Sequence, residues 1–303
     1  MPTMRVTQGL MVDRVLNDLR AQTRRLLELQ EELSTGLRVN DPSDDPLAAR
    51  RAVSIRTQIG KDEQYLTNIS SAGPQLLESV TVIQTTLNNL QRARELTLQG
   101  ASGTYSQLQL NQMAIEINEI LEGTLMEANH ETSGRFVFGG TRTLQRPFLE
   151  TRDAGGQITA VAYQGNDEYI RIAVADNSLV RINEPGARVF QSTQDIFQML
   201  IDIRDNLRAG DQDSMQARLA ELSDAEEQLL ISMAQIGATQ NRLERLTFNT
   251  EDFVQQLHGT LSDNIDADYA ETVLNLNAET NAFQAALNAA ARVIQPSLLD
   301  FVQ

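Results

Sequence analysis

Apolar residues recur in heptads at both ends of this chain, and the middle of the chain lacks this spacing. Steps of three and four residues place apolar side chains in a narrow stripe on an α-helix, which is the surface that one helix offers to another. The sequence therefore predicts an assembly seam built from both ends. Its residues are Val12, Val15, Leu19, Leu26, Leu29, Leu33, Val273, Leu276, Phe283, Leu287 and Ile294. The two stripes can pair with each other, with copies of the same chain, or with both.

The charge of the chain limits its partners. A formal net charge of -16 disfavours nucleic acid and anionic membrane surfaces, because both repel an acidic protein. The sequence has no apolar run of the length that crosses a membrane. Acidic residues are concentrated in 241–303, and this C-terminal segment can attract an N-terminal helix with a modest electrostatic gain.

Turn and cap residues divide the N-terminal half into helices. A helix is expected over 12–34, with Gly36 as the residue that ends it. Asp45 then suits the N-cap of a helix that begins at Pro46 and runs to about residue 71. Gly73–Pro74 predicts the start of a new helix, and a further helix is expected over 107–130.

The periodicity changes from helical to alternating at about residue 135. Apolar residues alternate there, and turn signals that contain glycine, including Pro185–Gly186, separate short predicted strands up to about residue 190. Helix is expected again over 193–207, with a break at 209–211 and a long helix after it. Segments 74–100 and 215–243 are expected to pack on each other.

These elements predict a mainly α fold with a small β insertion: a long antiparallel helical bundle with coiled-coil-like termini and an outer antiparallel β domain. Three domains are expected. Segments 1–42 and 256–303 form a terminal coiled-coil domain, 43–135 and 193–255 form the helical bundle, and 136–192 form the insertion. The turn-rich insertion is expected to have a small core of its own, so that the bundle folds without it.

The sequence offers little for catalysis. The chain has no cysteine, and its two histidines, His130 and His258, lack partners at metal-ligand spacing. Asp41, Asp44 and Asp45 lack the alternating acidic spacing of a calcium loop, so we interpret them as a turn and a helix cap. We predict a protein that is not an enzyme and that uses no cofactor and no metal.

Short motifs resemble those of bacterial flagellins. The run 33–40, followed by Asp44–Asp45, resembles their N-terminal signature, and the run 236–243 resembles a signature late in their helical domain. The two prolines of 42–46 and the ending 297–301 are similar to one branch of that family, which forms the junction between hook and filament. The run 136–143 resembles that branch's entry into its β domain, whereas the rest of 136–192 matches no motif.

This resemblance implies a structural role and a set of partners. Such a protein joins the flagellar hook, through the other hook–filament junction protein, to the flagellin filament, and it assembles with copies of itself in a ring. It leaves the cell unfolded through the flagellar type III apparatus, with an export chaperone bound to its C-terminal segment. Its place is the extracellular flagellum, with the terminal helices innermost and the β domain outermost. Neither nucleic acid nor a membrane is an expected partner.

Two other functions remain open from the sequence. A filament flagellin would share the helical signatures, although the paired prolines and the ending argue against it. A secreted coiled-coil adhesin or translocator would explain the heptads but not the run 236–243.

Overall fold

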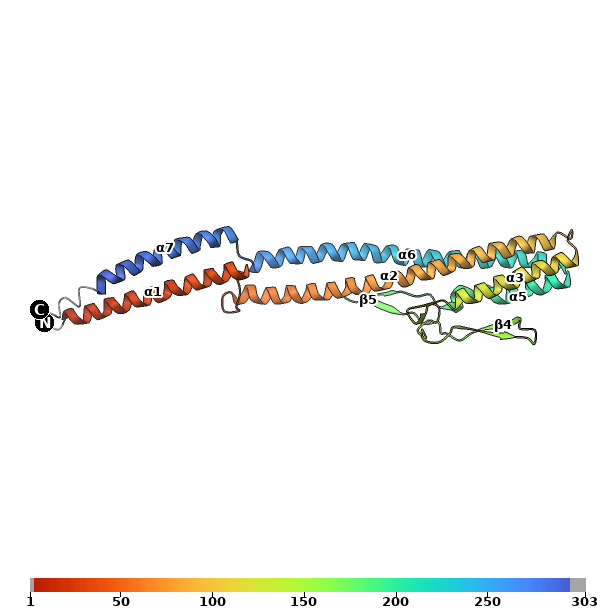
Figure 1. Ribbon diagram of the computed structural model, residues 1–303, viewed down its shortest axis with the longest axis horizontal. Coiled ribbons are helices and arrows are strands. Elements are labelled where there is room, and N and C mark those ends of the chain that lie inside the picture. The colour runs from red at the N-terminus through yellow and green to blue at the C-terminus, as the bar shows by residue number, and fades with distance from the viewer. Residues whose placement is uncertain (1–2, 295–303) are drawn as a thin grey trace. The chain divides into compact units, whose positions relative to one another are not determined.

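Long helices and three short β-hairpins make up the computed structural model, which describes residues 3–294 and the side chains of residues 10–291 (Figure 1). The helices are α1 (Thr3–Thr35), α2 (Pro46–Ala101), α3 (Gln107–Ala128), α4 (Gly186–Phe190), α5 (Ile196–Ala209), α6 (Gln212–Ile265) and α7 (Tyr269–Ile294). The strands are β1 (Glu131–Thr132), β2 (Arg135–Phe136), β3 (Phe148–Arg152), β4 (Ile158–Tyr163), β5 (Arg171–Ala175) and β6 (Ser178–Arg181). They pair antiparallel as β1–β2, β3–β4 and β5–β6. The predicted fold class is confirmed.

The chain divides into two compact units. Unit 1 comprises residues 1–61 and 253–303, and unit 2 comprises residues 62–252. The helices α2 and α6 each contribute one part to unit 1 and the other part to unit 2. The finer division of the chain into three domains stays a prediction.

In unit 1, α1 and α7 pack along each other in opposite directions (Figure 1). Helix α1 ends where the sequence predicts, because Gly36 adopts a left-handed conformation with φ +73°. The chain then crosses to the end of α6, where the Arg38 and Val39 amides donate to the Ile265 carbonyl at 2.8 and 3.3 Å. Beneath this crossing lies a small core of buried apolar residues, made of Val39, Ala48, Ala52 and Ile265.

The predicted cap of α2 is confirmed. The carboxylate Oδ1 of Asp45 accepts hydrogen bonds from the Leu47 and Ala48 amides, each at 3.0 Å. The side chain thereby satisfies two amides of the first turn that have no partner within the helix.

The predicted break at Gly73–Pro74 is wrong, since α2 continues through Pro74. A proline inside a helix costs about 3 kcal/mol, because it lacks the amide hydrogen and crowds the preceding turn. Ile69 and Leu76, on either side of Pro74, are both buried in the same core. Tertiary packing over the whole length of the helix therefore outweighs the local preference to stop.

In unit 2 the bundle helices share one core. Leu87 and Leu90 of α2 belong to the same buried cluster as Leu222 and Leu229 of α6. An ion pair between Arg94 and Glu226, at 3.0 Å, links the same two helices at the surface. The predicted packing of 74–100 on 215–243 is confirmed, and α3 and α5 pack closely together beside it.

The β insertion does not have a core of its own, so this expectation is wrong. Phe148 of β3 is fully buried, and its ring centre lies 5.1 Å from that of Phe197 on α5 and 5.4 Å from that of Phe190 on α4. Pro185–Gly186, predicted as a turn between strands, instead begins α4 and brings Phe190 into this cluster. Helix α5 then starts at Ile196, a few residues later than predicted, with Asp195 as its cap. Insertion and bundle are packed as one body.

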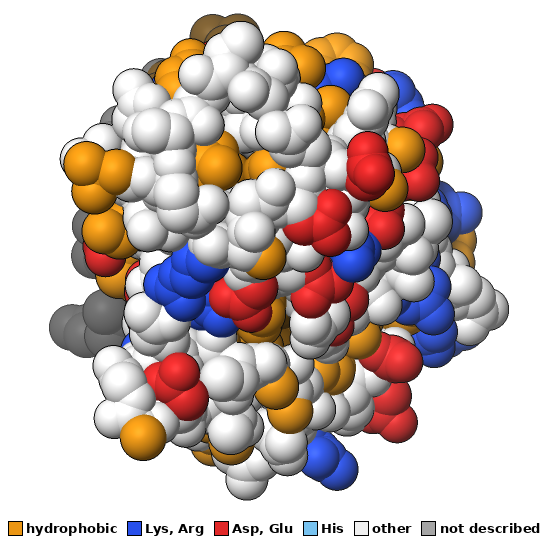
Figure 2. All heavy atoms as spheres, turned by 90° about the vertical axis from the view of Figure 1, so that its right-hand side faces the viewer, with side chains coloured by type: hydrophobic (Ala, Val, Ile, Leu, Met, Phe, Trp, Pro, Cys, Tyr) orange, Lys and Arg blue, Asp and Glu red, His pale blue; other side chains and the backbone are white. Residues whose placement is uncertain are grey.

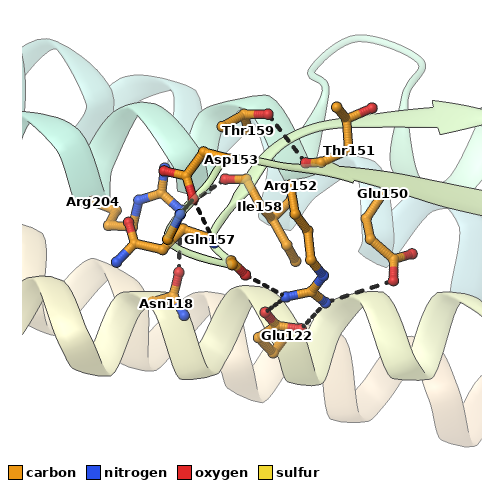
Figure 3. Close-up of polar contacts among 12 residues, drawn as sticks. Asn118, Glu122, Glu150, Thr151, Arg152, Asp153, Gln157, Ile158, Thr159 and Arg204 are labelled. Atoms are coloured by element: carbon orange, nitrogen blue, oxygen red, sulfur yellow. Dashed lines mark hydrogen bonds and ion pairs between the residues drawn. The ribbon is translucent and has the colours of Figure 1, made fainter.

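Polar side chains fasten the β3–β4 hairpin to the helices (Figure 3). Arg204 of α5 is only 2% exposed, and it donates to the Ile158 carbonyl at 2.8 Å and to Asn118 Oδ1 of α3 at 3.1 Å. Arg152 of β3 donates to both carboxylate oxygens of Glu122 on α3, at 2.6 and 2.8 Å. This paired hydrogen bond raises the pKa of Arg152.

A buried carboxylate, Glu184, makes the stability of unit 2 depend on pH. The residue is 7% exposed, and burial raises its pKa above the ordinary value of 4.5, although Arg181 and Arg188 act in the opposite direction. The unfolded chain therefore ionises first as the pH rises, and the folded protein loses stability above pH 4.5. We expect Glu184→Gln to melt at a higher temperature than wild type at pH 7.

Thermal melting between pH 4 and pH 8 checks this expectation. The advantage of Glu184→Gln should shrink as the pH falls, because the wild-type carboxyl becomes neutral as well. The exposed Glu131→Gln is the matched control and should show no such trend. An advantage that is the same at every pH would mean that ionisation of Glu184 is not its cause.

Candidate assembly surface

The structure brings the two predicted stripes together inside one chain. The α1 residues of the assembly seam are all half-buried: Val12, Val15, Leu19, Leu26, Leu29 and Leu33. On α7, Val273, Leu276 and Phe283 are half-buried as well. Leu287 is 45% exposed, and the side chain of Ile294 lies outside the described residues. The role of these residues in assembly stays a prediction.

Polar residues interrupt the seam at positions that the apolar heptads do not include. Gln22 falls between Val15 and Leu29 in the seven-residue series, and Glu279 falls between Leu276 and Phe283. The Oε1 atoms of both are buried without a hydrogen-bond partner among the described residues, and Arg25 Nη1 lies 4.0 Å from Glu279. A polar residue in a helix seam lowers stability but restricts how the helices can slide. In the sequence, the missing apolar residue at position 22 of the heptad series already indicated a polar residue in the seam.

Beside the seam lies a groove of about 700 Å³, which we call the basic groove. It is lined by Leu16, Asn17, Leu19, Arg20, Thr23, Arg24 and Phe283. Leu16 is exposed although it is apolar, and so is Leu27 further along the same helix. Exposed apolar side chains beside a groove are typical of a surface that binds another protein.

A second hollow, of about 440 Å³, lies at the other end of α1, and we call it the acidic pocket. It is lined by Glu28, Glu31, Glu32, Arg38, Asn40, Asp41, Ser43 and Asp44. The Asp44 carboxylate accepts from the Asn40 and Asp41 amides at 3.1 and 2.8 Å, so it shapes the turn. Within the described part of the chain, no three acidic, histidine or cysteine side chains are placed to hold a metal ion.

The two histidines, considered from the sequence as possible metal ligands, lie on different parts of the chain. His130 Nε2 lies 2.5 Å from the Glu78 carboxylate, and His258 is exposed on α6. The motif 297–301 lies outside the described residues. Among the helices that the structure describes, none combines the length and the apolar character that a membrane crossing requires.

Known proteins match this chain along most of its length. The family model for the bacterial flagellin N-terminal helical region matches residues 10–143. Flagellar hook-associated protein 3 of Escherichia coli K12 is 24% identical, over 94% of this chain and 96% of that protein. The protein of the same name from Salmonella typhimurium is 26% identical over 62% of this chain, and the match spans 57% of that protein.

A solved structure shows the same fold. The putative flagellar hook-associated protein from Vibrio parahaemolyticus superposes with a TM-score of 0.66 at 20% identity, over 74% of this chain and 100% of that one. Together with the sequence matches, it confirms the predicted resemblance. This chain is similar to proteins of the flagellin family, and among them it matches hook-associated protein 3 along most of its length.

Proposed function

We propose that this chain is a structural subunit of the bacterial flagellum that joins the hook, through the other junction protein, to the flagellin filament. The observation that carries the proposal is the match to hook-associated protein 3 along 94% of this chain and 96% of the relative. A subunit of this kind works by binding its neighbours, and its role is structural rather than enzymatic.

The paired terminal helices give this role a physical basis. Helices α1 and α7 bury part of each apolar stripe against the other and leave Leu16, Leu27, Leu274 and Leu287 exposed. Exposed apolar rows on a helix pair are costly in water and are stabilised when a neighbouring subunit covers them. We propose that the assembly seam and these exposed residues form the contacts with copies of the chain and with the two neighbouring flagellar proteins.

Export and location follow from the same role. We propose that the chain leaves the cell through the flagellar type III apparatus, with a chaperone on its C-terminal segment, and is incorporated into the extracellular flagellum. The acidic, alanine-rich sequence of 241–303 supports a segment that pairs with a helix from another protein.

Deletion of the gene tests the function. We expect cells that lack this chain to build hooks without filaments and to release flagellin monomers into the medium, because filament subunits are exported but find no junction. Electron microscopy counts hooks and filaments, and immunoblotting of the medium measures flagellin.

The alternatives give different results. Loss of a filament flagellin would leave hooks without releasing that flagellin, and loss of an adhesin or translocator would leave motility intact. Complementation with the wild-type gene is the control, and it should restore filaments. Normal filaments in the deletion strain would contradict the proposed function.

A further inference from the structure

Charge is separated along α1 and the turn that follows it. Residues 10–25 contain four arginines and two aspartates, whereas residues 26–45 contain six acidic residues and one arginine. On the end of unit 2 that faces the viewer in Figure 2, by contrast, acidic and basic side chains are interspersed. Separation on one element places a basic surface and an acidic surface at a fixed spacing in every copy of the chain.

The charges at the basic groove are unpaired within one copy. Arg20 and Arg24 are exposed at its edge, and neither forms an ion pair or a side-chain hydrogen bond with the part of the chain that the structure describes. The apolar side chains of Leu16 and of the seam residue Phe283 line the same groove. The groove therefore offers apolar area together with two free positive charges, which suits a helix that carries carboxylates.

The acidic pocket has the complementary character. Glu28 and Glu31 are exposed, and their carboxylates likewise form no ion pair among the described residues. They follow Arg24 by one and two turns of the same helix. Because α1 is rigid, Arg24 and Glu31 of one copy are separated by about 10 Å along the axis and cannot neutralise each other.

We propose that the basic groove of one copy binds the α1 surface at the acidic pocket of a second copy of this chain, so that Arg20 and Arg24 face Glu28 and Glu31 of the neighbour. The contact joins two different surfaces. A copy that uses its basic groove for one neighbour therefore still has its acidic pocket available for another. Contacts of this kind build rings or helical rows rather than closed dimers. This inference rests on the proposed function and specifies how copies meet within the junction.

Cysteine cross-linking in assembled flagella tests the contact, because the natural chain has no cysteine that would form competing disulfides. The full-length variant carries Arg24→Cys and Glu31→Cys and replaces the wild-type gene. Within one helix these positions are further apart than the roughly 7 Å between Cα atoms that a disulfide can bridge. After mild oxidation we therefore expect a ladder of covalent multimers. The control variant carries Asp18→Cys and Glu31→Cys, where Asp18 is an exposed acidic residue outside both surfaces, and should stay monomeric.

Charge reversal gives a second readout. The variants Arg20→Glu with Arg24→Glu, and Glu28→Arg with Glu31→Arg, should each reduce assembly into flagella by about tenfold or more, because like charges then face each other. A chain that carries all four changes restores opposite charges at the contact and should assemble again.

The results separate this inference from the proposed function. If cells with Arg24→Cys and Glu31→Cys build filaments but the chain stays monomeric after oxidation, the proposed contact is overturned. The proposed junction role is then unaffected. If the cysteine variant builds no filaments, the charge-reversal series decides. Its control is Asp18→Arg, a charge reversal at an exposed position outside both surfaces. Failure of the four-change variant to assemble, while this control assembles, would also overturn the contact.

Discussion

Placing one negative charge at position 283 is expected to abolish filament assembly and to leave unit 2 folded. Phe283 is half-buried between α7 and α1, and it lines the basic groove beside Leu19. Phe283→Asp would remove an apolar ring from the seam and put a strongly hydrated carboxylate beside Leu16 and Leu19, which weakens this apolar contact by roughly 1–3 kcal/mol. The change lies in unit 1, whereas the large aromatic and aliphatic core lies in unit 2. The melting of unit 2 should therefore be unchanged.

Asn281→Asp is the matched control, because it adds the same charge two residues away at an exposed position of the same helix. We expect cells with Asn281→Asp to swim almost as wild type and cells with Phe283→Asp to be non-motile. Swimming in soft agar and filament counts measure assembly, and thermal melting of the purified chains measures folding. Wild-type motility of Phe283→Asp would refute the claim that this seam builds the assembly. A lower melting temperature of unit 2 would place Phe283 in the core of that unit instead.

Phe148→Ala is expected to lower the free energy of unfolding of unit 2 by about 3–5 kcal/mol, the range for removing a fully buried phenylalanine ring. The ring of Phe148 lies within packing distance of Tyr163 on β4, Phe190 on α4 and Phe197 on α5. Its loss leaves a cavity where strands and helices meet. Because the insertion and the bundle share this core, we expect both to unfold in one weakened transition.

Leu149→Ala is the control for this prediction. Leu149 is the next residue of β3, and it is 44% exposed because neighbouring strand residues point to opposite faces. Its removal should cost less than about 1 kcal/mol. Urea denaturation, followed by circular dichroism, compares the two variants. An equal cost for both, with the helical signal of unit 2 unaffected, would mean that the β insertion is independent of the bundle.

Local signals in the sequence located most helix ends correctly. Gly36 and Asp45 act through their own backbone conformation or through amides two and three residues away, so a short stretch of sequence contains the whole cause. Pro74 misled the prediction because the packing that keeps α2 continuous comes from other helices. The shared aromatic core was not predictable either, since Phe148, Phe190 and Phe197 meet only in three dimensions.

The candidate assembly surface, like the core, was only partly predictable from the sequence. Heptad spacing predicted which residues of α1 face a partner helix, and the structure finds them half-buried against α7. The spacing alone could not reveal that Leu287 would remain 45% exposed, or that Gln22 and Glu279 would each bury an Oε1 atom in the seam without a hydrogen-bond partner among the described residues. Those outcomes depend on how far the two helices overlap, which is set by their connection through residues 36–45 and 266–268 rather than by either stripe.

Immunogold labelling of isolated flagella tests the central claim most directly. An antibody raised against the β insertion, residues 136–192, locates this chain on intact hooks and filaments by electron microscopy. The junction role predicts gold in a single narrow zone between hook and filament, and none on flagella from the deletion strain. Gold along the whole filament would instead identify a filament flagellin, and flagella without any gold would contradict a structural role in the flagellum.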